Sequence, residues 1–332
     1  MKIIADDNIP YLKGRLEPFA DVTYVDQDDF TPGLVKDADA LMIRTRTRCD
    51  SRLLDGSSVK MIATATIGMD QFDLPWCHAA GIETANAPGC NAPGVAQYVW
   101  SALLRAGFDP EKMTLGVVGH GNVGSIVARW GDLLGAKVLV CDPPRAEAGM
   151  TDRDYVRLER LLAESDAVTL HTPLLRDGRH PTHHLIGSRE ISLMRPGAIL
   201  VNAARGSVID TIPVKEALRD GRIRAIIDTW EGEPVIDREL LEMAEYGTFH
   251  IAGYSRQGKQ RATRMALEAV GRHFGIDFPT DGLEGPYAEP QALTPGKIMD
   301  SYDPAADTAM LRSDPAAFER LRAEYNYRPE VL

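Results

Sequence analysis

Short apolar runs, separated by polar or helical stretches, recur along the first part of the chain. They lie at residues 2–5, 22–25, 40–44 and 61–66. Short runs that are apolar almost throughout are typical of strands buried on both faces of a parallel sheet, with helices in the connections. The pattern therefore predicts a first α/β domain built on a parallel sheet.

The same alternation continues more regularly after residue 92. We predict six further strands, at residues 115–118, 138–141, 167–170, 198–201, 224–227 and 248–251. Six strands with helical crossovers make a doubly wound sheet, in which ligands bind beyond the carboxyl ends of the strands. Apolar helices at 95–105 and 259–274 are expected to carry the chain into this second domain and back.

We therefore predict an α/β chain of two doubly wound domains with the site in the cleft between them. Residues 1–91 plus 254–278 form the first domain, and residues 92–253 form the second. Residues 279–332 differ, because they hold seven of the 21 prolines and only one plausible helix, at 316–325. We expect this segment to be a C-terminal appendage rather than a third core.

A glycine motif opens the second domain. Gly119, Gly121 and Gly124 form G-x-G-x-x-G directly after the apolar run at 115–118. Apolar residues then recur at steps of three and four, as on one face of a helix. In this context the first glycine allows a tight turn, the second admits a pyrophosphate and the third lets helix and strand pack closely. The free N–H groups at the start of the helix would face the anion.

An acidic residue follows where a dinucleotide site needs one. Asp142 ends the next apolar run, and 142 − 124 places it 18 residues after the last glycine. A carboxylate there accepts hydrogen bonds from the adenosine ribose. Arg145 could attract the 2′-phosphate of NADP, but Asp142 would repel that phosphate. The sequence therefore predicts NAD as the cofactor.

Composition excludes several classes of partner. The formal net charge is −11, a poor match to nucleic acid or to an anionic membrane. No apolar run reaches bilayer length, and the N-terminus turns acidic too early for a signal peptide. The four cysteines show no C-x-x-C spacing. We expect a cytoplasmic protein with reduced thiols.

Three polar residues at predicted strand ends suggest acid–base chemistry. Arg205 follows a buried run and could clamp a carboxylate, although an arginine there is often only a surface ion pair. Glu233 lies 28 residues later, and His250 another 17. Oxidation of a secondary alcohol needs a base, and histidine titrates in the useful range. A neighbouring carboxylate would orient its ring, but both groups could equally be solvated.

Taken together, the motifs carry a resemblance to a known family. The order of the glycine loop, His171-Thr-Pro-Leu, Asn202-Ala-Ala-Arg-Gly, Glu233-Pro and His250 resembles the D-isomer-specific 2-hydroxyacid dehydrogenases. Further stretches are similar to the branch of that family that acts on a phosphorylated four-carbon substrate. These stretches are residues 5–11, 38–44, 64–70, 87–92, 141–145, 228–234 and 250–254.

The resemblance implies a fold and a reaction. The first domain would be a flavodoxin-like substrate domain and the second a Rossmann NAD-binding domain. The reaction would be the NAD-dependent oxidation of 4-phospho-D-erythronate to 2-oxo-3-hydroxy-4-phosphobutanoate, in pyridoxal phosphate biosynthesis. Hydride would pass from substrate C2 to nicotinamide C4. The family also has a C-terminal dimerisation domain, so we expect a homodimer with a shortened version of that region.

The resemblance also implies roles for matched residues. Arg205 would hold the substrate carboxylate, His250 would be the acid–base group and Glu233 its partner. The NAD site would comprise Gly119, Gly121, Asn122, Val123, Gly124, Asp142, Thr172, Ala203, Asp228 and Gly253. The substrate would contact Arg44, Thr45, Thr66 and Tyr254.

Some alternatives remain open at this point. Met69 and His120 depart from the family's pattern, so another D-2-hydroxyacid dehydrogenase, acting on phosphoglycerate, glyoxylate or a keto acid, is an alternative. A different class of function is an NAD-sensing binding protein on the same fold, as some corepressors are. His180, His183 and His184 suggest a metal site, but their loop offers no carboxylate or cysteine at ligand spacing. We predict no metal.

Overall fold

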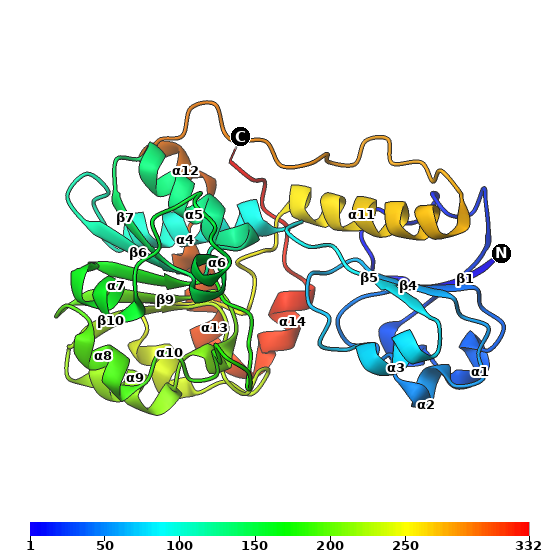
Figure 1. Ribbon diagram of the computed structural model, residues 1–332, viewed down its shortest axis with the longest axis horizontal. Coiled ribbons are helices and arrows are strands. Elements are labelled where there is room, and N and C mark those ends of the chain that lie inside the picture. The colour runs from blue at the N-terminus through cyan, green and yellow to red at the C-terminus, as the bar shows by residue number, and fades with distance from the viewer. Residues whose placement is uncertain (332) are drawn as a thin grey trace. The chain divides into compact units, whose positions relative to one another are not determined.

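The computed structural model describes residues 1–331 and contains two compact units (Figure 1). Unit 1 comprises Met1–Asn91 and Ser255–Ala288. Unit 2 comprises Ala92–Tyr254 and the described residues from Glu289 onward. The segment predicted as one appendage is thus shared between the units, its first ten residues lying in unit 1. The domain boundaries given above stay predictions about the functional domains.

Unit 1 is built on a five-stranded parallel sheet in the order β2-β1-β3-β4-β5. Its strands are β1 (Lys2–Asp6), β2 (Asp21–Val25), β3 (Ala40–Ile43), β4 (Met61–Thr64) and β5 (Glu83–Ala85). This is the flavodoxin-like order, so the predicted fold class is confirmed. The short β5 was not predicted, because none of its residues is fully buried and it lacks an apolar run.

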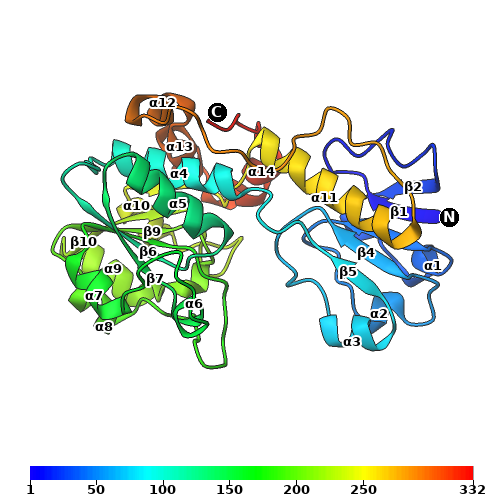
Figure 2. The ribbon, with the colours of Figure 1, turned by 45° about the horizontal axis from the view of Figure 1, so that its top comes forward.

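Helices cover both faces of this sheet (Figures 1 and 2). The long helix α11 lies across one face, and the other face carries α1, α2 and α3. The bounds are α1 (Pro32–Val35), α2 (Ser51–Leu54), α3 (Leu74–Ala79) and α11 (Arg256–Phe274). Every residue of β3 and β4 is buried as a result, which is why these strands read as continuous apolar runs.

Unit 2 contains a six-stranded parallel sheet in the order β11-β10-β9-β8-β6-β7. Its strands are β6 (Thr114–Val118), β7 (Lys137–Cys141), β8 (Ala167–Leu170), β9 (Ala198–Asn202), β10 (Ile223–Ile227) and β11 (Tyr246–Gly247). The chain leaves β6 for β7 on one side and later returns to β8 on the other. The carboxyl ends of β6 and β8 therefore form the topological switch point at which such sheets bind ligands.

Two helical layers sandwich the sheet of unit 2 (Figures 1 and 2). One layer contains α4 (Ala92–Arg105) and α5 (Asn122–Leu133). The other contains α7 (Leu158–Glu164), α8 (Ser188–Leu193), α9 (Thr211–Arg219) and α10 (Arg238–Met243). The short α6 (Pro143–Glu147) follows β7. Single 3-10 turns lie at Gln27–Asp29, Gly206–Val208 and Pro315–Ala317.

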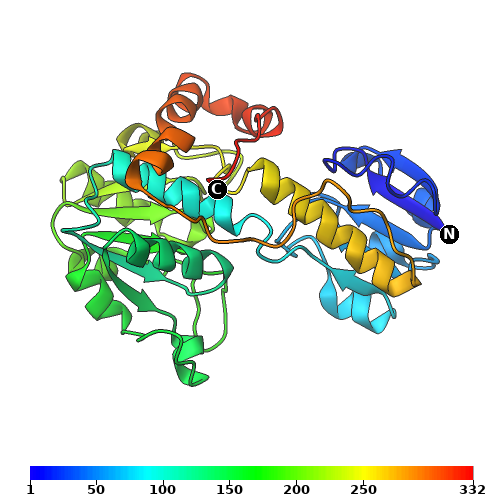
Figure 3. The ribbon, with the colours of Figure 1, turned by 90° about the horizontal axis from the view of Figure 1, so that it is seen from above.

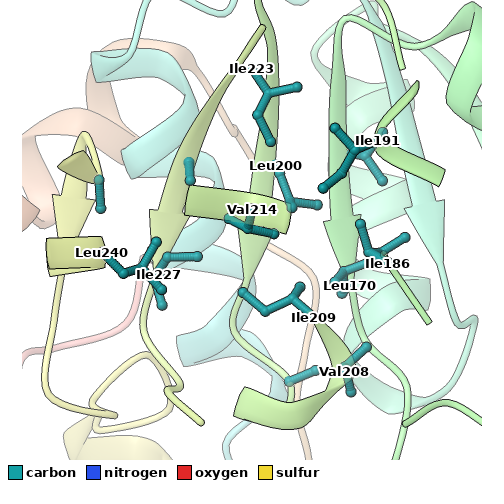
Figure 4. Close-up of a cluster of buried hydrophobic side chains, with 14 of the residues drawn as sticks. Leu170, Ile186, Ile191, Leu200, Val208, Ile209, Val214, Ile223, Ile227 and Leu240 are labelled. Carbon is teal, nitrogen blue, oxygen red and sulfur yellow. The ribbon is translucent and has the colours of Figure 1, made fainter. Parts of the chain in front are cut away.

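The second of these layers closes a large apolar core (Figure 4). Side chains of the central strands, including Leu170 and Ile227, face Ile191, Val214 and Leu240 of the helices. All five are buried. This core fixes the strands whose carboxyl ends carry the polar residues discussed below.

The sixth strand differs from the sequence prediction. It covers Tyr246–Gly247 rather than 248–251. His250 has φ of 60°, a left-handed conformation that interrupts a strand. The side chain of Asp228 then accepts hydrogen bonds from the N–H groups of Ile251 and Ala252, at 2.8 and 2.9 Å. The predicted strand is therefore an irregular segment held by a side chain.

The C-terminal segment contains more helix than its prolines suggested. It forms α12 (Pro295–Ser301), α13 (Pro304–Ser313) and α14 (Phe318–Ala323), which are orange to red in Figure 3. Pro295 and Pro304 each occupy the first helical position, where proline's missing N–H costs nothing. Leu311 and Phe318 belong to the core of unit 2. Among the described residues, no helix combines the length and apolarity that a membrane span requires.

Candidate active site and cofactor site

The glycine loop lies at the switch point of unit 2. Gly119 has φ of +92°, and a Cβ there would lie 2.7 Å from the carbonyl oxygen of His171, at the end of β8. A Cβ on Gly124 would overlap the carbonyl oxygen of Gly119. Both positions therefore require glycine, the first for the turn and the second for the close approach of α5 to its preceding strand.

Two features beside this loop fit a bound dinucleotide. Gly121 is the N-cap of α5, it offers no capping side chain, and the space beside it is open. The N–H groups of the first turn, at Asn122 and Val123, thus have no side-chain cap, as a pyrophosphate would require. Across the switch point, the Oγ1 atom of Thr172 is buried without a hydrogen-bond partner. A buried hydroxyl without a partner is costly unless a ligand supplies one.

Asp142 connects the glycine loop to the end of β7. One of its carboxylate oxygens accepts the backbone N–H of His120 at 2.7 Å, and the other accepts the N–H of Arg145 at 3.0 Å. The guanidinium of Arg145 is engaged elsewhere, with the Tyr155 hydroxyl at 2.8 Å and Asp152 at 2.9 Å. The negative charge of Asp142 thus stays beside the loop while Arg145 is already paired, an arrangement that favours NAD over NADP.

His120, which departs from the family's pattern, has a packing role. Its side chain is only 6% exposed, and its ring nitrogen Nδ1 lies 3.0 Å from the Tyr155 hydroxyl. Burial lowers the pKa of His120, and the nearby Asp152 opposes that effect only in part. The ring is therefore a neutral component of the loop's support.

Arg205 lies in a turn that other residues hold in place, and its guanidinium donates to the carbonyl oxygen of Ala204 at 2.8 Å. The amide of Asn202 donates to the carbonyl oxygen of Arg205 at 3.0 Å and accepts from the N–H of Ala204 at 3.2 Å. Ala203 lies in the same turn. A Cβ on Gly206 would overlap the backbone carbonyl of Trp230. The turn after β9 is therefore packed directly against the loop after β10.

His250 and Glu233 form a hydrogen-bonded pair. The His250 Nδ1 atom lies 2.8 Å from one oxygen of Glu233, and the other oxygen accepts the N–H of Trp230 at 2.7 Å. Burial alone would raise the pKa of Glu233, but the hydrogen bond and charge of His250 and the Trp230 N–H lower it overall. An ionised Glu233 accepts a hydrogen bond from the Nδ1–H of a neutral His250, which leaves Nε2 as the basic atom of the ring.

Trp230 links these loops, a role that residue spacing did not suggest. Its indole N–H donates to the carbonyl oxygen of Thr248 at 2.7 Å, two residues before His250. Its backbone contacts Gly206 and Glu233, as described above. Thr248 in turn hydrogen-bonds the Asp228 carboxylate at 2.6 Å. The sequence contains only one sign of this contact, namely that the motif at 228–234 contains a tryptophan and the motif at 202–206 ends in a glycine.

Asp228 is buried, and its carboxylate accepts hydrogen bonds from other residues of the same unit. Besides the hydroxyl of Thr248, it accepts the two N–H groups of the segment after His250. The structure therefore assigns Asp228 to holding the segment that leads to Gly253. Its predicted contact with the cofactor stays a prediction.

The substrate residues predicted in unit 1 lie at the carboxyl edge of its own sheet. Arg44 follows β3, and its Nε atom is 3.0 Å from the fully buried carboxylate of Asp6, at the end of β1. The Thr66 hydroxyl lies 2.7 Å from that of Thr64. Thr45 is exposed next to Arg44. Asp6 was not among the predicted site residues, because it is 38 positions away from Arg44.

Two other residues named from the sequence, Met69 and Tyr254, have defined surroundings. Met69, which departs from the family's pattern, packs against an apolar cluster of unit 1. Tyr254, in unit 2, contacts aromatic rings of the C-terminal segment, at centroid distances of 6.2 Å from Tyr325 and 6.1 Å from Tyr327. The part of the chain that ends the sequence therefore reaches the neighbourhood of His250.

The histidines of the 180–184 loop are paired with carboxylates that their local sequence does not contain. His180 lies 3.1 Å from Glu147, and Nε2 of His184 lies 2.8 Å from Glu231. His183 stacks on His184, and with Glu231 they offer three ligand atoms within 4.8 Å of one another. The loop itself still offers no carboxylate at ligand spacing, but the fold brings Glu231 to it from 47 residues away. The prediction of no metal stays untested.

A family model covers the unit that carries this site. Residues 93–264 match the D-isomer-specific 2-hydroxyacid dehydrogenase NAD-binding domain. Among solved structures, D-lactate dehydrogenase from Aquifex aeolicus, complexed with NAD and lactic acid, is 25% identical with a TM-score of 0.70. That match covers 86% of this chain and 100% of that chain. The TT0316 protein from Thermus thermophilus is 26% identical with a TM-score of 0.69, over 84% of this chain and 99% of that chain.

Curated relatives match over almost the whole chain. Erythronate-4-phosphate dehydrogenase from Bacteroides fragilis is 46% identical over 99% of this chain and 97% of the relative. The proteins of the same name from Porphyromonas gingivalis and Escherichia coli are 40% and 39% identical, over 100% and 99% of this chain and 94% and 92% of those relatives. Together with the glycine loop and the His250–Glu233 pair, these matches show that the chain belongs to the erythronate-4-phosphate dehydrogenases, within the D-isomer-specific 2-hydroxyacid dehydrogenase family.

Proposed function

We propose that this chain oxidises 4-phospho-D-erythronate at C2 to 2-oxo-3-hydroxy-4-phosphobutanoate, with NAD as the hydride acceptor, in pyridoxal phosphate biosynthesis. The observation that carries the proposal is the 2.8 Å contact between His250 and Glu233, in a loop packed against the Arg205 turn. The name that the relatives share supports the choice of substrate.

The glycine loop, the first turn of α5, Asp142 and Thr172 would hold NAD. Ala203, Asp228 and Gly253 complete the predicted set of cofactor residues. When bound, NAD supplies an acceptor for the hydride at nicotinamide C4. The uncapped start of α5 would bind the pyrophosphate, and Asp142 would bind the ribose hydroxyls.

His250 would act as the base for the C2 hydroxyl. Its neutral ring takes the hydroxyl proton on Nε2 as the C–H bond breaks, and in the reverse direction the imidazolium returns that proton. Glu233 holds the Nδ1–H and stabilises the positive charge that develops on the ring. The pair therefore works at neutral pH, because Glu233 stays ionised there.

Arg205 would hold the substrate carboxylate and polarise the C2 oxygen. A guanidinium can bind a carboxylate through two parallel hydrogen bonds, which fixes the orientation of C2. Arg44, Thr45, Thr66 and Tyr254 would contact the rest of the substrate. Hydroxyl groups and a guanidinium suit the hydroxyl and phosphate groups of a phosphorylated sugar acid.

We further propose a cytoplasmic homodimer. All four cysteines are free and buried, which fits a reducing compartment. Residues 1–91 with 254–278 would be the substrate domain, residues 92–253 the NAD domain, and residues 279–332 a short dimerisation region. Sedimentation velocity of the purified chain tests the dimer.

A substrate panel monitored by NADH absorbance tests the reaction. The panel comprises 4-phospho-D-erythronate, D-erythronate, 3-phospho-D-glycerate, glycolate (the reduced form of glyoxylate) and D-lactate. We expect kcat/KM to be highest for 4-phospho-D-erythronate and to fall sharply without its phosphate. NADH binding without turnover of any of these acids would instead favour an NAD-sensing protein.

A further inference from the structure

The C-terminal segment is anchored to the residues that follow His250. Phe318 is fully buried in the core of unit 2. The ring of Tyr325 lies edge-on to Phe249 at 6.0 Å and to Tyr254 at 6.2 Å. Residues on both sides of His250 thus contact one C-terminal ring, which lies two residues after the end of α14 (labelled in Figure 1).

Arg328 strengthens this anchor. Its side chain is 7% exposed, and it donates to the carbonyl oxygens of Ile251 and Gly94 at 3.0 Å each, and to that of Ala252. A buried guanidinium that satisfies three backbone carbonyls is costly to displace. The segment after His250 is therefore held by Asp228 through its N–H groups and by Arg328 through its carbonyl groups.

This anchoring places a second arginine against Tyr254. The guanidinium of Arg322, on α14, lies 5.7 Å from the centre of the Tyr254 ring. Its side chain is 20% exposed, and its Nε atom is buried without a hydrogen-bond partner. It forms an ion pair with Glu319 at the long separation of 3.9 Å. The positive charge of Arg322 also contributes to lowering the pKa of Glu233, which places that charge near the catalytic carboxylate.

Arg44 in unit 1 has a different charge environment. Its guanidinium is paired at 3.0 Å with the buried carboxylate of Asp6, which compensates its charge. A phosphate carries up to two negative charges and binds best to a cation that is not already neutralised. Arg205 is reserved for the substrate carboxylate. Arg322 therefore has the properties that the second anionic group of the substrate requires.

We propose that Arg322 is a further substrate-binding residue, which takes the phosphate of the substrate beside Tyr254. This inference rests on the proposed function, because it presupposes a substrate that carries a phosphate as well as a carboxylate. The C-terminal segment then determines specificity in addition to covering the core of unit 2. Its buried Nε–H would gain the acceptor that it lacks within the chain.

The test compares Arg322→Met with Arg320→Met, its neighbour on the same helix, whose side chain is 58% exposed. Steady-state kinetics with 4-phospho-D-erythronate and D-erythronate are followed by NADH absorbance. We expect Arg322→Met to lower kcat/KM for the phosphorylated substrate by about 10- to 100-fold, mainly through KM, and to change that for D-erythronate by less than about twofold. Arg322→Lys should recover part of the loss, and Arg320→Met should resemble the unchanged enzyme.

Two results would overturn the assignment. One is an undiminished preference for the phosphorylated substrate in Arg322→Met. The other is an equal loss for both substrates, which would mean that Arg322 acts through Glu233 instead. If Arg322→Met does not fold, Arg322→Lys and Arg322→Gln are compared with each other, because only the lysine retains the charge. If the unchanged enzyme shows no preference for the phosphorylated substrate, the proposed function itself fails, whatever the variants do.

Discussion

The two units place charged residues at the same edge of similar parallel sheets, but they compensate those charges differently. In unit 1, the Arg44 guanidinium is paired with the buried Asp6, and the hydroxyls of Thr64 and Thr66 pair with each other. In unit 2, an ionised carboxylate is paired with a titratable ring, at 2.8 Å between Glu233 and His250. One edge pairs a guanidinium with a carboxylate, and the other pairs a carboxylate with an imidazole ring.

In the proposed mechanism, this difference makes the edge of unit 2 the one that transfers a proton. His250 is partly exposed, and its Nδ1 atom lies 2.8 Å from the ionised carboxylate of Glu233. His171, also at a strand end of unit 2, shows the opposite case. Burial lowers its pKa to about 3, and its ring is 2.9 Å from the Thr169 hydroxyl. Of these two histidines, only His250 has a carboxylate partner, and the proposed mechanism assigns the proton transfer to it.

The largest expected effect comes from removing the titrating group. His250→Ala should lower kcat by about 10²–10⁴-fold, because no other group takes the hydroxyl proton. NADH binding, measured by fluorescence titration, should be unchanged. His78→Ala, at an exposed position in unit 1, is the control and should retain full activity. An unaffected kcat in His250→Ala would remove the distinction between the two edges.

The next effect comes from disturbing the packing between loops. In Gly206→Ala, the added methyl group would overlap the backbone carbonyl of Trp230, so the turn that carries Arg205 must shift. We expect kcat/KM to fall by about 100-fold, because Arg205 is then misplaced. The substitution should also lower the free energy of unfolding by about 1–3 kcal/mol. Gly296→Ala, where no atom lies within 4 Å, should leave both quantities almost unchanged. Activity assays with chemical denaturation measure both, and equal behaviour of the two variants would contradict the role of this contact.

Replacing the carboxylate partner should have a smaller effect with a specific pH signature. Glu233→Gln should reduce kcat by about 10- to 100-fold and shift the acidic limb of the oxidation profile to lower pH. The sign follows because oxidation requires the neutral ring, and the imidazolium loses its anionic neighbour. Glu231→Gln is the matched control, because Glu231 lies two residues before Glu233 but is the partner of His184. This variant should leave the pH profile of oxidation unchanged. A shift to higher pH in Glu233→Gln would be incompatible with the pairing.

The smallest effect is expected in unit 1. Arg44→Met should raise KM for 4-phospho-D-erythronate by about 10-fold and change kcat little, because we expect this edge to bind the substrate and take no part in proton transfer. Arg48→Met, whose side chain is 59% exposed, serves as the comparison variant. Steady-state kinetics decide the outcome. A fall in kcat at constant KM would mean that the edge of unit 1 participates in the chemical step.

Much of the fold was predictable because its signals are local. The parallel strands appear as apolar runs, since helices bury both faces of each sheet. The glycine loop and Asp142 form a motif of about 25 residues with a known geometric purpose. The last strand of unit 2 was predicted at the wrong residues, because a single sequence does not reveal that the backbone of His250 is left-handed. The helices after residue 289 were missed because proline marks a helix start as well as a break.

The arrangement of the site was less predictable, because it depends on contacts between distant positions. Trp230 contacts Gly206, and Asp6 pairs with Arg44 across 38 residues. Arg328 binds the carbonyl group of Ile251 across 77 residues. No spacing rule relates these pairs, since they meet only after β-α units have brought strand ends together. The sequence therefore identifies the chemical groups, and the structure identifies what holds them.

Isotope transfer from the substrate tests the central claim most directly. 4-Phospho-D-erythronate that carries deuterium at C2 is incubated with NAD and the purified chain, and the reduced cofactor is analysed by mass spectrometry. We predict NADH that carries one deuterium, formed more slowly than with unlabelled substrate, and almost none with His250→Ala. Unlabelled NADH, or labelled NADH formed equally fast by His250→Ala, would contradict oxidation at C2 with His250 as the base.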